Sequence, residues 1–261
     1  MNYNPPKVWS KTKKTGNLFT DESRMITGAR FEQNLSVGKK PLQLYTLGTP
    51  SGIRVHILLE ELAELGVTEA EYDAFAIDIS RGEQYGSDFV NINPNAKIPA
   101  LIDTSLSPAV TLFESDAILH YLADKHQLFL PQNPEKRAKA MSWLFWQTGS
   151  SPYVGGGFGH FYAFAPEKLE YPIDYFTLEV KRQLDLLNKY LADKEFLAGE
   201  EYSIADMAVW SWYGRLVLGQ VYGSGEFLQV NSYPNLQAWA KRILKRPAVQ
   251  RALHLKLKPI N

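Results

Sequence analysis

The sequence predicts an α/β domain followed by an all-helical domain, and three observations point to this fold class. Four short segments have the apolar or alternating patterns of strands: residues 42 to 47, 70 to 79, 97 to 103 and 109 to 113. Two helical patterns, residues 51 to 66 and 114 to 126, lie among them and give the order β-α-β, then β-β-α. After residue 130 only helical patterns follow, near residues 134 to 149, 166 to 193, 203 to 219 and 233 to 246.

The elements of the α/β domain follow from burial patterns and loop lengths. The run LQLYTL at residues 42 to 47 is continuously apolar, as in a buried strand. In the helix that follows, apolar residues lie mostly on one face and Gly66 ends the helix, while His56 is expected on its exposed surface. Only the loop TSLSP separates the last two strands, so they are predicted to form an antiparallel hairpin.

In the helical domain, residues 203 to 219 are apolar nearly all round and are therefore expected in the interior. Ser203 and Asp206 at its start have the spacing of a capping box. Residues 142 to 166 lack charged side chains over the length of a membrane span, but glycines and prolines interrupt them, which predicts a buried, partly irregular segment. We divide the chain into three parts: an irregular arm at 1–40, the α/β domain at 41–127 and the helical domain at 128–261.

Composition narrows the classes of function. The 28 basic and 28 acidic residues balance, so the net charge gives no attraction to nucleic acid or to an anionic membrane, and neither is expected as a partner. The chain has no cysteine, so any thiol chemistry must use a thiol from a ligand. The histidines show no metal-ligand spacing, and no metal is expected. The N-terminus has no signal-peptide pattern, which favours a cytoplasmic protein.

The stretch GTPSG at residues 48 to 52 lies where the first strand gives way to the first helix. Helix initiation alone explains it, because Thr49 is a good N-cap and Pro50 a good first helical residue. Alternatively, the free amides and positive dipole end of this helix start would hold a thiolate or a carboxylate. Both readings stay open from the sequence, with Thr49 and Ser51 as the candidate groups.

Two further stretches admit both a structural and a functional interpretation. Pro99 lies where a strand begins, a position that tolerates proline; a cis Ile98-Pro99 bond would instead turn the Ile98 backbone outward to pair with an extended peptide. Glu114 and Ser115 open a helix directly after a strand. Glu114 suits an ammonium group there, and the hydroxyl and amides at Ser115 suit a carboxylate, which together point to an amino-acid ligand.

Taken in order, these motifs resemble the glutathione transferases, and more closely their bacterial Nu class. The resemblance covers about residues 40 to 250 and rests on these stretches: PLQLYTLGTP, ILLEEL, NPNAKIPAL, FES, LFWQTG, GGGFGHFYAFAP and SIADMAVW. It implies a thioredoxin-like N-terminal domain and a helical C-terminal domain, that is, the glutathione transferase fold. One departure is Ser51, where close relatives typically carry asparagine.

The resemblance also implies roles for single residues. Thr49 and Ser51 would be catalytic at the sulfur of glutathione, whereas Tyr45 lies within the strand and is assigned no such role. The glutathione-binding residues would be Glu114 and Ser115 for the γ-glutamyl end, Ile98 before a cis Pro99 for the cysteinyl unit, and Gln84 and Lys97 for the glycyl end. A second glutathione would meet Ser23, Thr148 and Tyr175.

The implied function is a disulfide-bond reductase that uses glutathione as cosubstrate and acts on small disulfides, with organic hydroperoxides as further substrates. Two alternatives are a transferase that conjugates glutathione to electrophiles and a non-catalytic module for protein association. The family also implies a homodimer.

Overall fold

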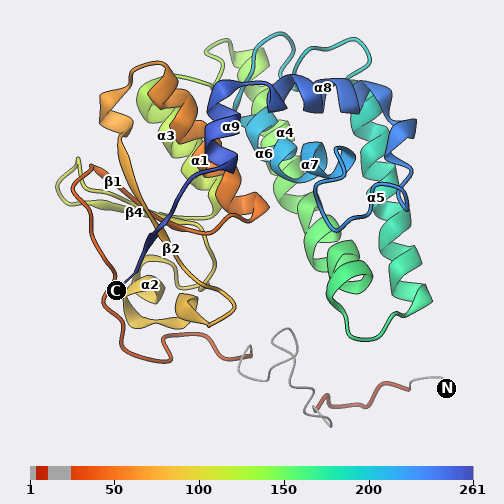
Figure 1. The fold of residues 1–261 in the computed structure, drawn as a ribbon, viewed down its shortest axis with the longest axis horizontal. Coiled ribbons are helices and arrows are strands. Elements are labelled where there is room, and N and C mark those ends of the chain that lie inside the picture. Colours follow the sequence, from red (N-terminus) through yellow and green to blue (C-terminus); the bar gives the residue numbers. More distant parts are fainter. Residues whose placement is uncertain (1–3, 11–24, 261) are drawn as a thin grey trace.

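The computed structural model describes residues 4–10 and 25–260, and its elements form an α/β part and a helical part (Figure 1). The α/β part contains these elements in chain order: β1 (Leu42–Thr46), α1 (Pro50–Glu64), β2 (Tyr72–Ala76), α2 (Ser87–Ile92), β3 (Ala100–Asp103), β4 (Val110–Phe113) and α3 (Ser115–His126). Short 3₁₀ turns, Thr68–Ala70 and Glu83–Tyr85, lie between them. This arrangement confirms the predicted β-α-β and β-β-α order.

The sheet has the strand order β4-β3-β1-β2-β5, where β5 (Lys258–Pro259) comes from the end of the chain. Strands β1 and β2 are parallel, and β3 pairs antiparallel with both β1 and β4, so the predicted hairpin is confirmed. Helices α1 and α3 pack on the face that looks toward the helical part, over Leu42 and Leu44 (Figure 1). The opposite face carries Tyr45 and packs against Phe89 of α2. The sheet is therefore buried on both faces.

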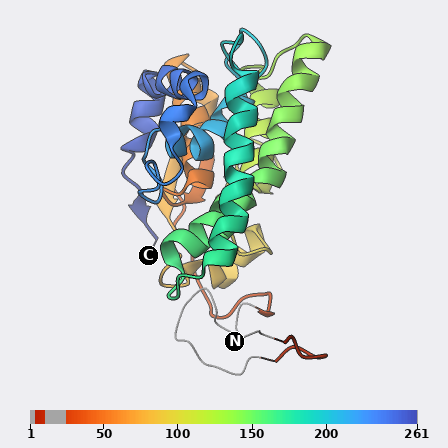
Figure 2. The same ribbon diagram turned by 90° about the vertical axis from the view of Figure 1, so that its right-hand side faces the viewer.

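The helical part is built around two long helices, α4 (Pro134–Pro152) and α5 (Glu170–Tyr190), which run in opposite directions in Figure 2. A π-helix, Tyr153–Phe164, connects them. The remaining elements are α6 (Ile204–Val209), a π-helical turn (Trp210–Gly214), α7 (Arg215–Val217), a 3₁₀ turn (Val230–Ser232), α8 (Pro234–Leu244) and α9 (Pro247–Leu253). The capping box of Ser203 and Asp206 is present, as predicted.

Several local expectations differ from the structure. Residues 142 to 166 were expected to be buried and partly irregular, but α4 continues into the π-helix Tyr153–Phe164, and Phe145 and Phe164 are exposed. In the π-helix, three glycines lie against rings that an added Cβ would meet: Gly155, Gly157 and Gly159. The single helix predicted at 203–219 is interrupted by a π-helical turn. Helix α9 and strand β5 were not predicted; β5 is only two residues long and joins the sheet edge through pairing with β2.

The expectation that His56 lies on a helix surface was wrong, because His56 is 2% exposed. Helix α1 is enclosed by the sheet, by α3 and by α6 and α9 of the helical part, so even its polar side has neighbours. The His56 ring lies 6.2 Å from that of Tyr72. The side of α1 that the sequence pattern assigned to solvent is therefore covered at His56 by Tyr72 of β2.

Residues 25 to 40 run along the α/β part without a regular element. Arg30 N donates to the Tyr85 carbonyl at 2.8 Å, and Leu35 N donates to the Asp88 carboxylate at 2.9 Å. The Tyr45 hydroxyl donates to the Ser36 carbonyl at 2.9 Å, and burial raises the pKa of Tyr45 to about 12. Tyr45 therefore anchors this segment.

Candidate active site

The sheet register brings the three candidate stretches to the same end of adjacent strands. Tyr45 of β1 pairs with Ala100 of β3, and Ala100 pairs with Phe113 of β4. The residues that follow β1, precede β3 and follow β4 are therefore neighbours at the same end of three adjacent strands. They are the GTPSG stretch, Ile98-Pro99 and Glu114-Ser115.

Thr49 is the N-cap of α1, and its Oγ1 accepts a hydrogen bond from Gly52 N at 3.3 Å. A threonine hydroxyl has one proton to donate besides its lone pairs, so capping leaves the Thr49 O–H available to another acceptor. Ser51 is partly exposed in the first turn. Helix initiation and anion binding are therefore compatible at Thr49, which resolves the conflict between the two readings of the sequence.

Gly52 fixes how closely this helix start approaches the sheet. A Cβ added at Gly52 would lie 2.0 Å from the Leu47 carbonyl oxygen and 2.6 Å from Oγ1 of Thr46. Because both atoms belong to the end of β1 and its loop, only a glycine lets the first turn of α1 pack there. In the sequence, Gly52 stands out only as the end of the GTPSG stretch, and no local pattern indicates its packing role.

The other candidates for glutathione binding also have defined positions. The Ile98-Pro99 bond is cis. Glu114, with φ of 66°, precedes α3 and is exposed, while Ser115 is buried in its first turn. Lys97 is exposed, and its carbonyl accepts from Asn93 Nδ2 at 2.6 Å.

Gln84 is buried in the 3₁₀ turn Glu83–Tyr85, and its Oε1 has no hydrogen-bond partner among the described residues. The backbone around it is held by the segment before β1: Gln33 Nε2 donates to the Glu83 carbonyl at 3.0 Å. A buried amide oxygen without a partner is unusual, so Gln84 is a group with unused hydrogen-bonding capacity.

A buried arginine that the sequence reading missed connects the two helix starts. Arg54 of α1, 2% exposed, donates through Nη1 to Asp116 Oδ1 of α3 and to Gln147 Oε1 of α4, each at 2.6 Å. Its Nε donates to Ser211 Oγ at 3.1 Å. An arginine among the apolar residues of a buried helix was the sequence signal for this network.

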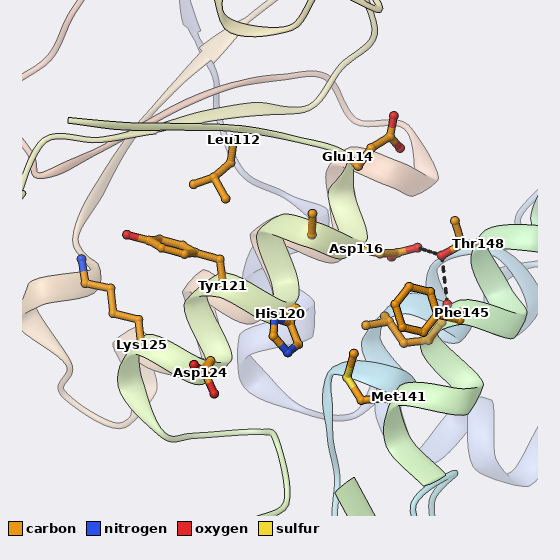
Figure 3. Close-up of a pocket in the computed structure, with 12 residues that line it drawn as sticks. Leu112, Glu114, Asp116, His120, Tyr121, Asp124, Lys125, Met141, Phe145 and Thr148 are labelled. Atoms are coloured by element: carbon orange, nitrogen blue, oxygen red, sulfur yellow. Dashed lines mark hydrogen bonds between the residues drawn. The ribbon is translucent and has the colours of Figure 1, made fainter. Parts of the chain in front are cut away.

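The Thr148 hydroxyl donates to Asp116 Oδ2 at 2.6 Å, so α4 contacts the residue that follows Ser115 (Figure 3). Thr148, Glu114 and Asp116 line a cavity of about 680 Å³ between α3 and α4, together with apolar residues that include Met141 and Phe145. In Figure 3 the Asp116 carboxylate points across the gap at Thr148, whereas the Glu114 carboxylate points away from it.

The three candidates for a second glutathione come from different segments of the chain. Thr148 lies at the cavity between α3 and α4, whereas Tyr175 is exposed on α5, where its ring contacts Tyr171 and Phe176. Ser23 lies outside the described residues. Within residues 4–10 and 25–260, no cluster of acidic or histidine side chains is arranged to hold a metal ion, and no helix has the length and apolar character to span a membrane.

Comparison with known proteins decides the family. Residues 40–124 match the glutathione S-transferase N-terminal domain, and residues 176–242 match the glutathione S-transferase C-terminal domain. The chain is 55% identical over 249 residues to the disulfide-bond oxidoreductase YghU of Escherichia coli, which covers 95% of this chain and 86% of that protein. The chain belongs to the glutathione transferase family.

Solved structures of family members agree. A glutathione transferase YghU from Streptococcus pneumoniae, complexed with glutathione, has a TM-score of 0.97 and 55% identity over 100% of both chains. A glutathione transferase from Pseudomonas putida with one glutathione disulfide bound per subunit has a TM-score of 0.77 and 34% identity, covering 84% of this chain and 94% of that one. The fold implied by the motifs, a thioredoxin-like domain followed by a helical domain, is thereby confirmed.

Proposed function

We propose that this transferase is a glutathione-dependent disulfide-bond reductase. Two observations support the proposal: the chain has no cysteine, and its GTPSG, Ile98-Pro99 and Glu114-Ser115 stretches meet at the same end of β1, β3 and β4. Such a site can do thiol chemistry only with a thiol that a ligand brings. The identity to YghU, a disulfide-bond oxidoreductase, supports the choice of reaction.

Each candidate residue has a role in this proposal. Glu114 holds the ammonium of the γ-glutamyl unit, and Ser115 with the free amides of the α3 start holds its carboxylate. The Ile98 backbone pairs with the cysteinyl unit as an added strand. Lys97 and the unpartnered Oε1 of Gln84 serve the glycyl end, where Gln84 would gain the hydrogen bond it lacks.

The sulfur of glutathione lies at the start of α1 in this arrangement. Lowering a thiol pKa from about 8.5 by about two units requires about 2.7 kcal/mol. A helix N-terminus supplies about 0.3 to 1 kcal/mol, and a hydrogen bond to the anion adds about 1.5 to 3 kcal/mol. The Thr49 O–H, left free by the capping geometry, can make this bond, and Ser51 is the second donor.

The reaction then follows thiol-disulfide exchange. The glutathione thiolate attacks one sulfur of the substrate, the substrate S–S bond breaks, and the leaving thiolate takes up a proton. A second glutathione thiolate attacks the mixed disulfide, which releases the second substrate thiol and glutathione disulfide. The Pseudomonas putida relative that holds one glutathione disulfide per subunit supports a site with room for both molecules, and Ser23, Thr148 and Tyr175 remain our candidates for the second. The same thiolate would reduce organic hydroperoxides.

We further propose that the protein is a cytoplasmic homodimer, with domains at 41–127 and 128–261 after an arm at 1–40. The cavity between α3 and α4 supports the dimer: it is largely apolar, and Phe145 at its edge is 67% exposed. A second copy would cover this surface. Light scattering of Phe145→Glu beside the wild type tests the contact, and a variant that stays dimeric would rule out this surface.

The test of function is a coupled assay that follows glutathione disulfide formed from glutathione and 2-hydroxyethyl disulfide. Turnover well above the uncatalysed rate is expected, and its absence would overturn the proposal. Conjugation of glutathione to a chlorinated nitrobenzene, measured in parallel, separates the reductase from a conjugating transferase. Calorimetric titration with glutathione separates both from a non-catalytic association module, which would bind it weakly or not at all.

A further inference from the structure

Helix α1 and the α6–α7 segment pack side by side in opposite directions, and two contacts fix their register. Near the end of α1, Arg246 contacts both segments. Its Nε lies 2.5 Å from Glu61 Oε1 of α1, and its Cζ lies 4.0 Å from the centre of the Tyr202 ring, just before α6. Near the start of α1, Arg54 Nε donates to Ser211 Oγ at 3.1 Å. Moving toward the start of α1 therefore means moving forward from residue 202 to residue 211.

One helical turn further in the same direction lies Arg215. It follows Ser211 by four residues, about one turn of an α- or π-helix, so both residues lie on the side of the segment that faces α1. Pro50 precedes Arg54 by the same four residues. Extending the register by one turn brings Arg215 level with Pro50, in the first turn of α1.

Arg215 is a cation without a partner among the residues that the structure describes. Its Nε is buried and makes no hydrogen bond, and burial lowers the pKa of its guanidinium with no carboxylate nearby to oppose this. By contrast, Arg54 of α1 binds the Asp116 carboxylate, and Arg246 and Arg251, which pack against α1, bind carboxylates of that helix. Arg215 is only partly buried, so its guanidinium is open to an anion from outside the chain, which would give Nε the hydrogen bond that it lacks.

We propose that Arg215 is a specificity-determining residue that binds a carboxylate of the disulfide substrate, so that the enzyme prefers acidic disulfides. The inference rests on the proposed disulfide reduction and extends it to a substrate class. The carboxylates of the first glutathione are accounted for at Ser115 and at Lys97. A guanidinium at the start of α1 lies near the proposed position of the glutathione sulfur, where the disulfide substrate must enter. Its planar set of N–H donors suits a carboxylate.

The test compares three small disulfides that differ in charge: dithiodiacetate, 2-hydroxyethyl disulfide and cystamine. In Arg215→Gln, the ratio of kcat/KM for dithiodiacetate to that for 2-hydroxyethyl disulfide should fall about tenfold or more, as for the loss of a charge-assisted hydrogen bond. The ratio for cystamine should not fall. Arg215→Lys keeps the charge but loses the paired N–H donors of the guanidinium, so it should recover part of the preference for dithiodiacetate.

Lys241→Gln is the matched control, because Lys241 is exposed on α8 and its loss changes the net charge equally. It should leave both ratios as in the wild type. Circular dichroism melting shows whether Arg215→Gln is folded, and Arg215→Met provides a second uncharged variant if it is not. Unchanged ratios, including the case in which kcat/KM falls equally for all three disulfides, would overturn the inference while the proposed function stands. A wild-type enzyme that reduces none of the three would overturn both.

Discussion

Arg54 Nη1 lies 2.6 Å from Asp116 Oδ1, and this ion pair joins the helices whose first turns form the proposed glutathione site. Arg54 comes five residues after Thr49 on α1, and Asp116 directly follows Ser115 on α3. The Arg54 side chain is 2% exposed and that of Asp116 13% exposed, and the pair extends through Gln147 and Thr148 to α4. It therefore holds the sulfur end and the γ-glutamyl end of the site at a fixed separation.

Arg54→Met should lower the free energy of unfolding by about 3 to 5 kcal/mol, because it leaves the Asp116 carboxylate and the Gln147 amide oxygen without their partner. Urea denaturation measures this. The double variant Arg54→Met/Asp116→Leu should recover part of the loss, since no unpaired charge remains. If the single variant were as stable as the wild type, the pair would have no role in joining the two helices.

The Thr49 hydroxyl has two predicted functions that different measurements separate. Thr49→Ala should lower the free energy of unfolding by about 1 kcal/mol through loss of the N-cap, and should raise the thiol pKa of bound glutathione, followed by thiolate absorbance against pH. Thr49→Ser keeps a hydroxyl and should preserve both. Ser51→Ala should leave stability nearly unchanged, so a higher thiol pKa in that variant alone would assign the sulfur contact to Ser51.

Gly52→Ala should impair the site more than a single methyl group suggests. The added Cβ would meet the Leu47 carbonyl at 2.0 Å, and backbone atoms there have little room to move. We expect a loss of about 1 to 3 kcal/mol in the free energy of unfolding and a raised KM for glutathione. Gly149→Ala is the control, because nothing lies within 4 Å of a Cβ there; equal behaviour of the two variants would contradict the packing argument.

The sequence predicted the parts of this fold that depend on local patterns. The strands from β1 to β4, helices α1 and α3, and the Ser203–Asp206 capping box each follow from periodicity or spacing within a few residues. Strand β5 could not be predicted, because two residues carry no period and owe their conformation to the β2 edge. The same holds for the π-helix, in which glycines are used for contact with rings from distant segments.

The site shows the same limit. Thr49, Glu114 and Ser115 were recognisable because strand-to-helix transitions leave a local signature, and the sheet register then places them together. The partners of Arg54 lie on three other helices, at positions 116, 147 and 211, and no local pattern announces them. His56 was misplaced for a related reason: helical periodicity identifies the most apolar face but does not reveal which neighbours cover the other, and here Tyr72 of β2 lies against His56.

The buried position of His56 predicts how stability depends on pH. Burial lowers the pKa of His56 to about 4, against about 6.5 for an unfolded chain. Between these values the unfolded state binds the proton more readily, so stability falls as the pH decreases from 6.5 toward 4, and His56 has no such effect above pH 7. The full difference corresponds to about 3 kcal/mol.

His56→Leu removes this titration, and no hydrogen bond is lost at Nδ1, which has no partner among the described residues. In urea denaturation from pH 7.5 to 4.5, the free energy of unfolding of the variant should therefore decrease by about 2 to 3 kcal/mol less than that of the wild type. His254→Gln is the control, since His254 is exposed, and should follow the wild-type pH dependence. Parallel curves for His56→Leu and the wild type would show that His56 takes up a proton in the folded protein as easily as in the unfolded chain. Its burial beside Tyr72 opposes that protonation, so parallel curves would contradict the prediction.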